Sequence, residues 1–90
     1  MYLYVRQSVE DYTRWRAGFD KHASARQASG ATDEAYVMRS VDNPNEVTVI
    51  LGWNDLQQAR AFTQSASLRE AMQSAGVVGQ PEIRFLESAD

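Results

Sequence analysis

The chain has no cysteine, which excludes two common ways of stabilising a small protein. Neither a disulfide nor a thiolate metal site can hold the fold together, so the 90 residues must build a hydrophobic core. The only histidine is His22, and a single histidine without cysteine argues against a zinc site. We therefore expect no metal and no cofactor.

Long apolar runs and clusters of positive charge are also missing. No stretch approaches the roughly 20 apolar residues of a membrane helix. The first residues, MYLYVRQ, are typical of a strand and not of a signal peptide. Nine basic residues are spread along a chain of net charge −3, whereas nucleic-acid binding depends on clustered positive charge. We expect a cytoplasmic protein that binds neither a membrane nor nucleic acid.

The short motifs of several catalytic and metal-binding classes are absent as well. The sequence contains no Gly-x-Ser-x-Gly elbow, no phosphate-binding glycine loop and no dinucleotide fingerprint. The polar run at 42–46 includes Pro44 and lacks the central glycine of an EF-hand loop, so it does not predict a calcium site. Pro and Asn in this run instead predict a turn.

What the sequence does contain is an alternation of strand and helix patterns. Residues that favour strands are concentrated in four segments: Tyr2–Val5, Ala35–Met38, Glu46–Trp53 and Glu82–Leu86. A capping box at Ser8–Asp11 predicts the start of a first helix, which Gly30 ends. Asn54 or Asp55 is expected to cap a second helical region, with a break at Ser65–Ser67, a capping box beginning at Ser67 and an end at Gly76.

The resulting order, β-α-β-β-α-β, predicts a fold of the α+β class. With right-handed crossovers, two such units interleave into a ferredoxin-like sandwich. This is a four-stranded antiparallel sheet with the helices on one face. We expect residues 1–90 to form one domain of this type.

The strand expected at Glu46–Trp53 has almost no polar face. One side of the strand carries Val47, Val49, Leu51 and Trp53. The other side carries Thr48, Ile50 and Gly52. Helices cover only one face of such a sheet, and an antiparallel sheet open to water should alternate apolar and polar residues. The uncovered face therefore predicts a homodimer built around a central β-barrel. The alternative is a monomer whose strands are apolar on both sides.

One face of the first helix gathers the candidate catalytic residue and several aromatic side chains. The residues at spacings of three and four are Tyr12, Trp15, Phe19, His22 and Arg26. His22 has an ordinary pKa near neutrality, so it is a candidate general base that takes a phenolic proton. The alternative is a hydrogen-bonded histidine at the edge of the core.

A substrate pocket with aromatic walls is the second prediction for this region. The candidate substrate-binding residues are Tyr4, Tyr12, Trp15, Phe19 and Trp53, with Tyr36 as a further member of the wall. The alternative for each is an ordinary place in the core. Arg26 and Arg39 are candidates for anchoring an anionic substrate or for surface ion pairs. Gly18 leaves room for a ligand or permits close packing, and Gly76–Gly79 is expected to be a lid or a loop against a partner subunit.

Several segments resemble a known group of proteins. The segments are Val9–His22, Arg26–Thr32, Asp42–Asp55, Phe62–Met72 and Ala75–Glu87. They are similar to small proteins of the dimeric α+β barrel superfamily, in its antibiotic biosynthesis monooxygenase-like and cyclase-like branch. The resemblance implies a homodimer with a cleft between helices and sheet in each subunit. In characterised relatives that cleft holds small, often aromatic or polyketide-like molecules, and some relatives oxidise them with O₂ and no metal or flavin.

Haem-degrading relatives use a histidine on the second helix, and residues 55–75 contain none, so we expect no haem. The sequence is compatible with three functions. The first is a cofactor-independent monooxygenase, cyclase or isomerase that acts on an aromatic or polyketide-like compound. The second is a non-catalytic ligand-binding or interaction module on the same scaffold. The third, an RNA-recognition domain, is disfavoured because the strand at 46–53 has no basic residue and one terminal aromatic.

Overall fold

Strands and helices alternate along the chain in a computed structural model that describes residues 1–90. The strands are β1 (Tyr2–Val9), β2 (Ala31–Arg39), β3 (Glu46–Trp53) and β4 (Val77–Leu86). The helices are α1 (Tyr12–Lys21), α2 (Ala23–Ala28), α3 (Leu56–Thr63) and α4 (Ala66–Ser74). No helix combines the length and the apolar character needed to span a bilayer.

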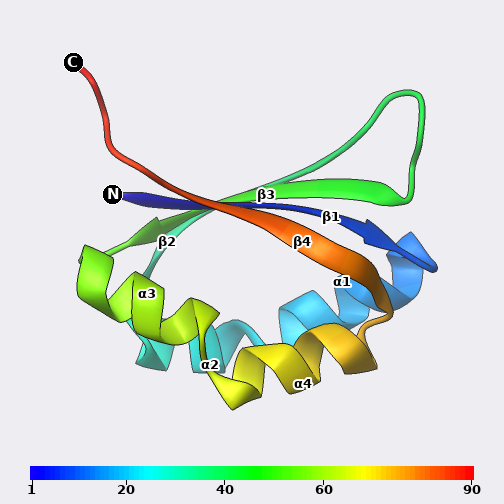
Figure 1. The fold of residues 1–90 in the computed structure, drawn as a ribbon, viewed down its shortest axis with the longest axis horizontal. Coiled ribbons are helices and arrows are strands. Elements are labelled where there is room, and N and C mark those ends of the chain that lie inside the picture. Colours follow the sequence, from blue (N-terminus) through cyan, green and yellow to red (C-terminus); the bar gives the residue numbers. More distant parts are fainter.

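The four strands form one antiparallel sheet in the order β2-β3-β1-β4, and the helices cover one of its faces (Figure 1). The predicted ferredoxin-like arrangement is therefore confirmed. The bounds of β3 agree with the sequence pattern, and the turn at 42–45 joins it to β2 as expected. Each predicted helical region is divided in two, the first at His22 and the second at Ser65.

The helix caps correct two details of the sequence reading. Ser8 lies on β1, and the side chain of Asp11 accepts the hydrogen bond from the Arg14 N–H that begins α1. The helix break at 65–67 is confirmed, but Ser65 is the cap of α4, since its hydroxyl accepts from the Leu68 N–H. At the start of α3, Asp55 is the cap.

Strands β1, β2 and β4 are longer than their sequence patterns indicate. The segment Gly76–Gly79 is therefore neither a lid nor a loop, because Val77 pairs with Val9 and Val78 pairs with Ser8 inside the sheet. A register shift between Arg6 and Ser8 marks a bulge opposite this part of β4. Gly79 has φ +71°, a backbone angle that glycine adopts without strain.

The core lies between the helices and the inner face of the sheet. Eleven buried apolar residues form one cluster: Leu3, Val5, Val9, Trp15, Val47, Val49, Leu51, Trp53, Ala59, Phe62 and Ala75. The side of β3 that begins with Val47 thus faces the helices, and the side with Ile50 faces away. The alternation predicted for β3 is confirmed, and its inner side is now assigned.

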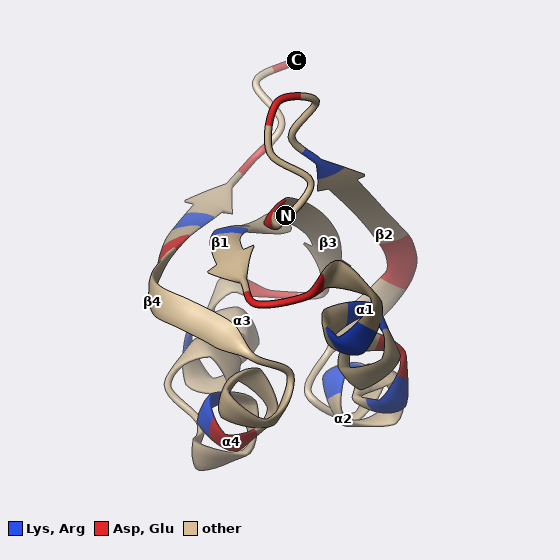
Figure 2. Cartoon of the chain, turned by 90° about the vertical axis from the view of Figure 1, so that its right-hand side faces the viewer, with Lys and Arg blue, Asp and Glu red and all other residues tan.

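The outer face of the sheet is apolar at its centre and has charged side chains around it. Its exposed large apolar side chains are Tyr36, Met38, Val78 and Leu86, and the cross-strand pairs place Tyr4 and Ile50 between them. The expectation of an apolar outer face is therefore wrong outside this centre. Arg6 pairs with Glu46 near the bulge. Arg84 is the cross-strand partner of Tyr4, and the Glu34 carboxylate accepts hydrogen bonds from the hydroxyls of Tyr2 and Tyr36. Figure 2 shows charged positions on β1, β2 and β4 as well as on the helices.

Candidate functional site

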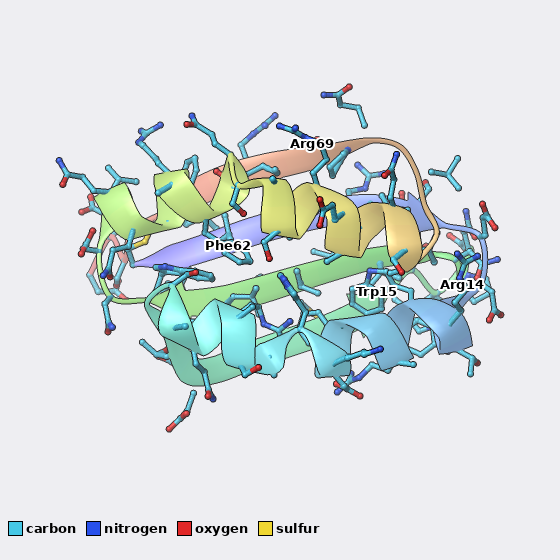
Figure 3. All side chains as sticks on the ribbon, turned by 90° about the horizontal axis from the view of Figure 1, so that it is seen from below. Arg14, Trp15, Phe62 and Arg69 are labelled. Atoms are coloured by element: carbon cyan, nitrogen blue, oxygen red, sulfur yellow. The ribbon has the colours of Figure 1, made fainter.

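A small cavity lies between the helices and the inner face of the sheet. Its volume is about 60 Å³, and 11 of its 15 lining residues are hydrophobic. The lining residues with polar side chains are Gln7, His22 and Arg26. In Figure 3, which looks from the helix side, Trp15 and Phe62 lie between the row formed by α1 and α2 and the row formed by α3 and α4. The cavity is thus an apolar space with a few polar groups.

Two contacts join the helix rows over the cavity. At the first, a Cβ atom added to Gly18 would lie 2.9 Å from the Cβ of Ala75, so α1 and α4 approach as closely as a glycine permits. The close-packing reading of Gly18 therefore describes the structure. At the second contact, Nε2 of His22 lies 3.1 Å from the hydroxyl of Ser67. Both contacts involve residues that line the cavity, namely Gly18, Ala75 and His22.

His22 occupies the junction of α1 and α2, where it ends one helix and begins the next. Its ring is half-buried, lines the cavity and packs against Phe62 at a centroid distance of 5.9 Å. Burial lowers the pKa of His22 below its ordinary value of 6.5, and the positive charge of Arg26 lowers this pKa further. The imidazole is therefore neutral at pH 7 and able to accept a proton.

We expect an NMR titration of His22 to have its midpoint below pH 6.5. The measurement is simple because His22 is the only histidine and gives a single Cε1–H resonance. In the Arg26→Gln variant the midpoint should move upward, since one of the two causes is removed, yet stay below 6.5 because burial is the larger cause. A wild-type midpoint at or above 6.5 would contradict the half-buried position of His22 beside Arg26.

Arg26 lies on α2 beside the same cavity. Its guanidinium carbon sits 3.7 Å from the centroid of the Phe19 ring, and Nη1 donates a 2.7 Å hydrogen bond to the Phe19 carbonyl. Burial lowers the pKa of Arg26, but an arginine remains charged at neutral pH. The cavity therefore has a fixed cation at its edge.

Gln7 is a polar residue that the sequence reading missed. It lies on β1 and is only 5% exposed. It borders both the cavity and a polar hollow beside Arg6. The signal was present in the sequence, because Leu3, Val5 and Val9 continue the inward alternation and Gln7 is its polar member.

The predicted aromatic wall is only partly assembled. Trp15 and Phe19 line the cavity and stack on each other at a centroid distance of 5.0 Å. Phe62, which was not in the predicted set, completes this wall. Trp53 does not line the cavity, because it is buried behind Phe62 at a centroid distance of 4.7 Å.

The two tyrosines proposed for substrate binding lie outside the cavity. Tyr12 is adjacent to Trp15, and the Arg39 guanidinium lies 4.0 Å from the Tyr12 ring centroid. Tyr4 is on the opposite face of the sheet, since it pairs with Ile50 while Leu3 and Val5 point inward. The placement of Tyr4 in a cleft between helices and sheet was therefore wrong. Tyr36 also faces outward, because it pairs with Ile50 on that face.

The residues of this chain offer no ready metal centre. No group of three or more histidine, aspartate or glutamate side chains is placed to hold an ion. The groups that remain for chemistry at the cavity are one neutral imidazole, one guanidinium and one amide. Such a set can bind a polar group of an apolar ligand and can move a proton at Nε2 of His22.

No protein-family model and no curated protein sequence matches the chain. Solved structures do match. One is a proposed antibiotic biosynthesis monooxygenase from Bordetella bronchiseptica, with 17% identity and a TM-score of 0.78, covering 98% of this chain and 95% of that chain. Another is SnoaB, a cofactor-independent oxygenase from Streptomyces nogalater, with 14% identity and a TM-score of 0.72 over 98% of this chain and 93% of that chain.

A third similar structure is the monooxygenase ActVA-Orf6 of Streptomyces coelicolor in complex with the ligand nanaomycin D. It is 23% identical, with a TM-score of 0.66 over 99% of this chain and 87% of that chain. These likenesses establish that the chain has the fold of the antibiotic biosynthesis monooxygenase-like proteins over nearly its whole length. The resemblance described from the sequence is confirmed for the fold.

Proposed function

We propose that this protein binds a small, mainly apolar molecule in the cavity and oxidises it with O₂ and no cofactor. The observation that supports this proposal most directly is the apolar cavity with a neutral His22 at its edge. The similar structures add support, because SnoaB is described as a cofactor-independent oxygenase and ActVA-Orf6 holds a small-molecule ligand.

The size of the cavity restricts the substrate. An engineered apolar cavity of about 150 Å³ is large enough to bind benzene. The present cavity, at about 60 Å³, is less than half that size. A compound with one aromatic ring therefore enters only when α1 and α4 separate slightly or when flexible side chains such as Met72 move. The proposed substrate is a compound with one ring or a short unsaturated chain, and it is smaller than a fused polyketide.

The proposed reaction converts an electron-rich phenol and O₂ into a quinone and water. His22, with its own proton on Nδ1, takes the phenolic proton at Nε2, in the position that the Ser67 hydroxyl occupies in this structure. The phenolate gives one electron to O₂, and the two radicals combine at a ring carbon to form a peroxide anion. This anion takes the proton back from Nε2 of His22 and becomes a hydroperoxide, so the imidazole is again neutral. Loss of water, which carries the ring C–H hydrogen with it, leaves one oxygen atom on the product.

A turnover screen tests this proposal. Oxygen uptake is measured with electron-rich one-ring phenols for the wild type and for His22→Gln, and the variant is expected to be about a hundredfold slower. Lys21→Gln is the matched control, because Lys21 is adjacent in sequence but exposed, and it should react as the wild type does. Equal and negligible rates in the wild type and His22→Gln would remove the catalytic proposal.

The second candidate is a non-catalytic module that binds the same kind of molecule. It is favoured by one observation: Nε2 of His22 already has a partner in Ser67, so no catalytic group is free in this structure. Ligand binding without turnover in the screen would establish this candidate over the first.

We further propose that two chains form a homodimer through their outer sheet faces. The apolar centre of that face, with Ile50 in its middle, supports this pairing. The β2–β3 loop and the chain after β4 extend on this side, away from the helices (Figure 1). Val41, in that loop, is fully exposed in the isolated chain, as expected for an apolar residue that contacts a partner.

A further inference from the structure

Arg26 is a half-buried cation without a counter-ion in the chain. The ion pairs of this structure join Arg6, Arg14, Arg16 and Arg84 to carboxylates, and Arg26 is not among them. Its side-chain hydrogen bond runs from Nη1 to the Phe19 carbonyl, and no nitrogen of the side chain is both buried and unpaired, so its other N–H groups remain open to solvent or to a ligand. Because the guanidinium is partly shielded from water and has no counter-ion, an anion beside it would be stabilised by charge-assisted hydrogen bonds.

Asp20, the carboxylate whose charge acts on Arg26, already forms an ion pair with Arg16. Asp20 raises the pKa of Arg26 against the lowering caused by burial, and Arg16 lowers it further. Asp20, however, accepts a hydrogen bond of 3.1 Å from the Nε of Arg16 and pairs with it along α1. Asp20 therefore does not neutralise Arg26, and the positive charge beside the cavity remains available.

We propose that the ligand of this cavity carries a carboxylate and that the Arg26 guanidinium binds it while the apolar body lies against Phe19 and Phe62. This inference rests on the proposed function, because it names the chemical class of the molecule bound at the same site. The cation–π contact of 3.7 Å holds the guanidinium plane over Phe19. A guanidinium held in one orientation suits the two oxygens of a carboxylate.

The charges at the cavity favour a carboxylate over a phosphate. Only one cation lines the cavity, since the lowered pKa of His22 keeps that imidazole neutral. One guanidinium balances a monoanion, whereas a phosphate dianion and its three oxygens need more donors than this apolar site offers. The substrate class is thus a small aromatic or unsaturated carboxylic acid.

Matched probes separate this inference from simple apolar binding. Benzoate and benzamide have nearly the same shape, and only benzoate is charged. We would titrate each into the full-length protein and follow amide resonances by NMR. Benzoate is expected to bind at least about tenfold more tightly than benzamide, because charge-assisted hydrogen bonds are the stronger ones. The chain has net charge −3, so non-specific electrostatics would favour the neutral probe.

Three variants complete the test. Arg26→Gln should remove the preference for benzoate and leave benzamide binding unchanged. Arg26→Lys keeps the charge without the planar fork and should retain a smaller preference, which gives a second reading if Arg26→Gln folds poorly. Arg69→Gln is the charge-matched control, because Arg69 is exposed on the edge of α4 away from α1 and should bind as the wild type does (Figure 3).

The outcomes are distinguishable. Equal binding of both probes to the wild type, or a preference that survives Arg26→Gln, overturns the carboxylate inference and leaves the proposed function standing. Failure of both probes to bind at concentrations up to about 10 mM, an affinity worth less than about 3 kcal/mol, overturns the proposed function and this inference together.

Discussion

Replacing Trp53 with alanine is expected to lower the free energy of unfolding by about 4 kcal/mol, within the range of about 3–5 kcal/mol typical of buried tryptophans. Trp53 ends β3 on the inner face with 2% of its surface exposed, and its ring packs against Phe62. Its indole N–H donates a 2.9 Å hydrogen bond to the carbonyl of Ser29. The substitution leaves both a cavity and an unpaired carbonyl at the end of α2.

A loss of this size is a large part of the total stability. A chain of 90 residues is expected to unfold with about 5–13 kcal/mol. Urea unfolding followed by circular dichroism, at one fixed protein concentration, measures the change. Leu56→Ala is the control, since Leu56 is 42% exposed on α3 and its truncation should alter stability by about 0.5 kcal/mol or less. Similar losses in the two variants would mean that Trp53 does not anchor the core.

The Ile50→Glu variant is expected to separate the proposed homodimer into single chains of 10.1 kDa. Ile50 lies at the centre of the outer face, between Tyr4 on β1 and Tyr36 on β2. In an isolated chain the new carboxylate stays in contact with water and costs little. Between two packed sheets it would be buried without a partner, and the two-fold symmetry would place one such charge on each side.

Light scattering during size-exclusion chromatography measures the result directly. The wild type should have twice the chain mass, and Ile50→Glu should have the mass of one chain with an unchanged circular dichroism spectrum. Gln57→Glu adds the same charge at an exposed position of α3 and should remain dimeric. A wild type that already has the mass of one chain, or an Ile50→Glu protein that stays dimeric, would remove the proposed interface.

Residue spacing in the sequence predicted part of the candidate site correctly. The helical spacing of Trp15, Phe19 and His22 places them on one side of α1 and α2, and all three line the cavity. Tyr4 was misplaced because strand residues alternate between faces, and the inward side is decided by the partner layer. Gln7 was missed because β1 was taken to end at Val5, although pairing with β3 and β4 extends it to Val9.

The position of Arg26 shows what a local pattern does not contain. Its spacing from His22 predicts the helix face on which it lies. That it has no counter-ion depends on Asp20, which binds Arg16 instead. The closeness of His22 to Ser67 likewise joins residues 45 positions apart, and no short-range signal indicates it.

Sequence alone determined the class of the fold, the bounds of β3, a cap at Asn54 or Asp55 and the break before α4. These features depend on side-chain alternation and on hydrogen bonds between residues a few positions apart, so a short stretch of sequence is enough to specify them. Only the tertiary structure decided which face of the sheet is covered, how far the outer strands extend and which polar groups meet at the cavity. Those features arise from pairing and packing between distant segments, whose energies no local stretch of residues specifies.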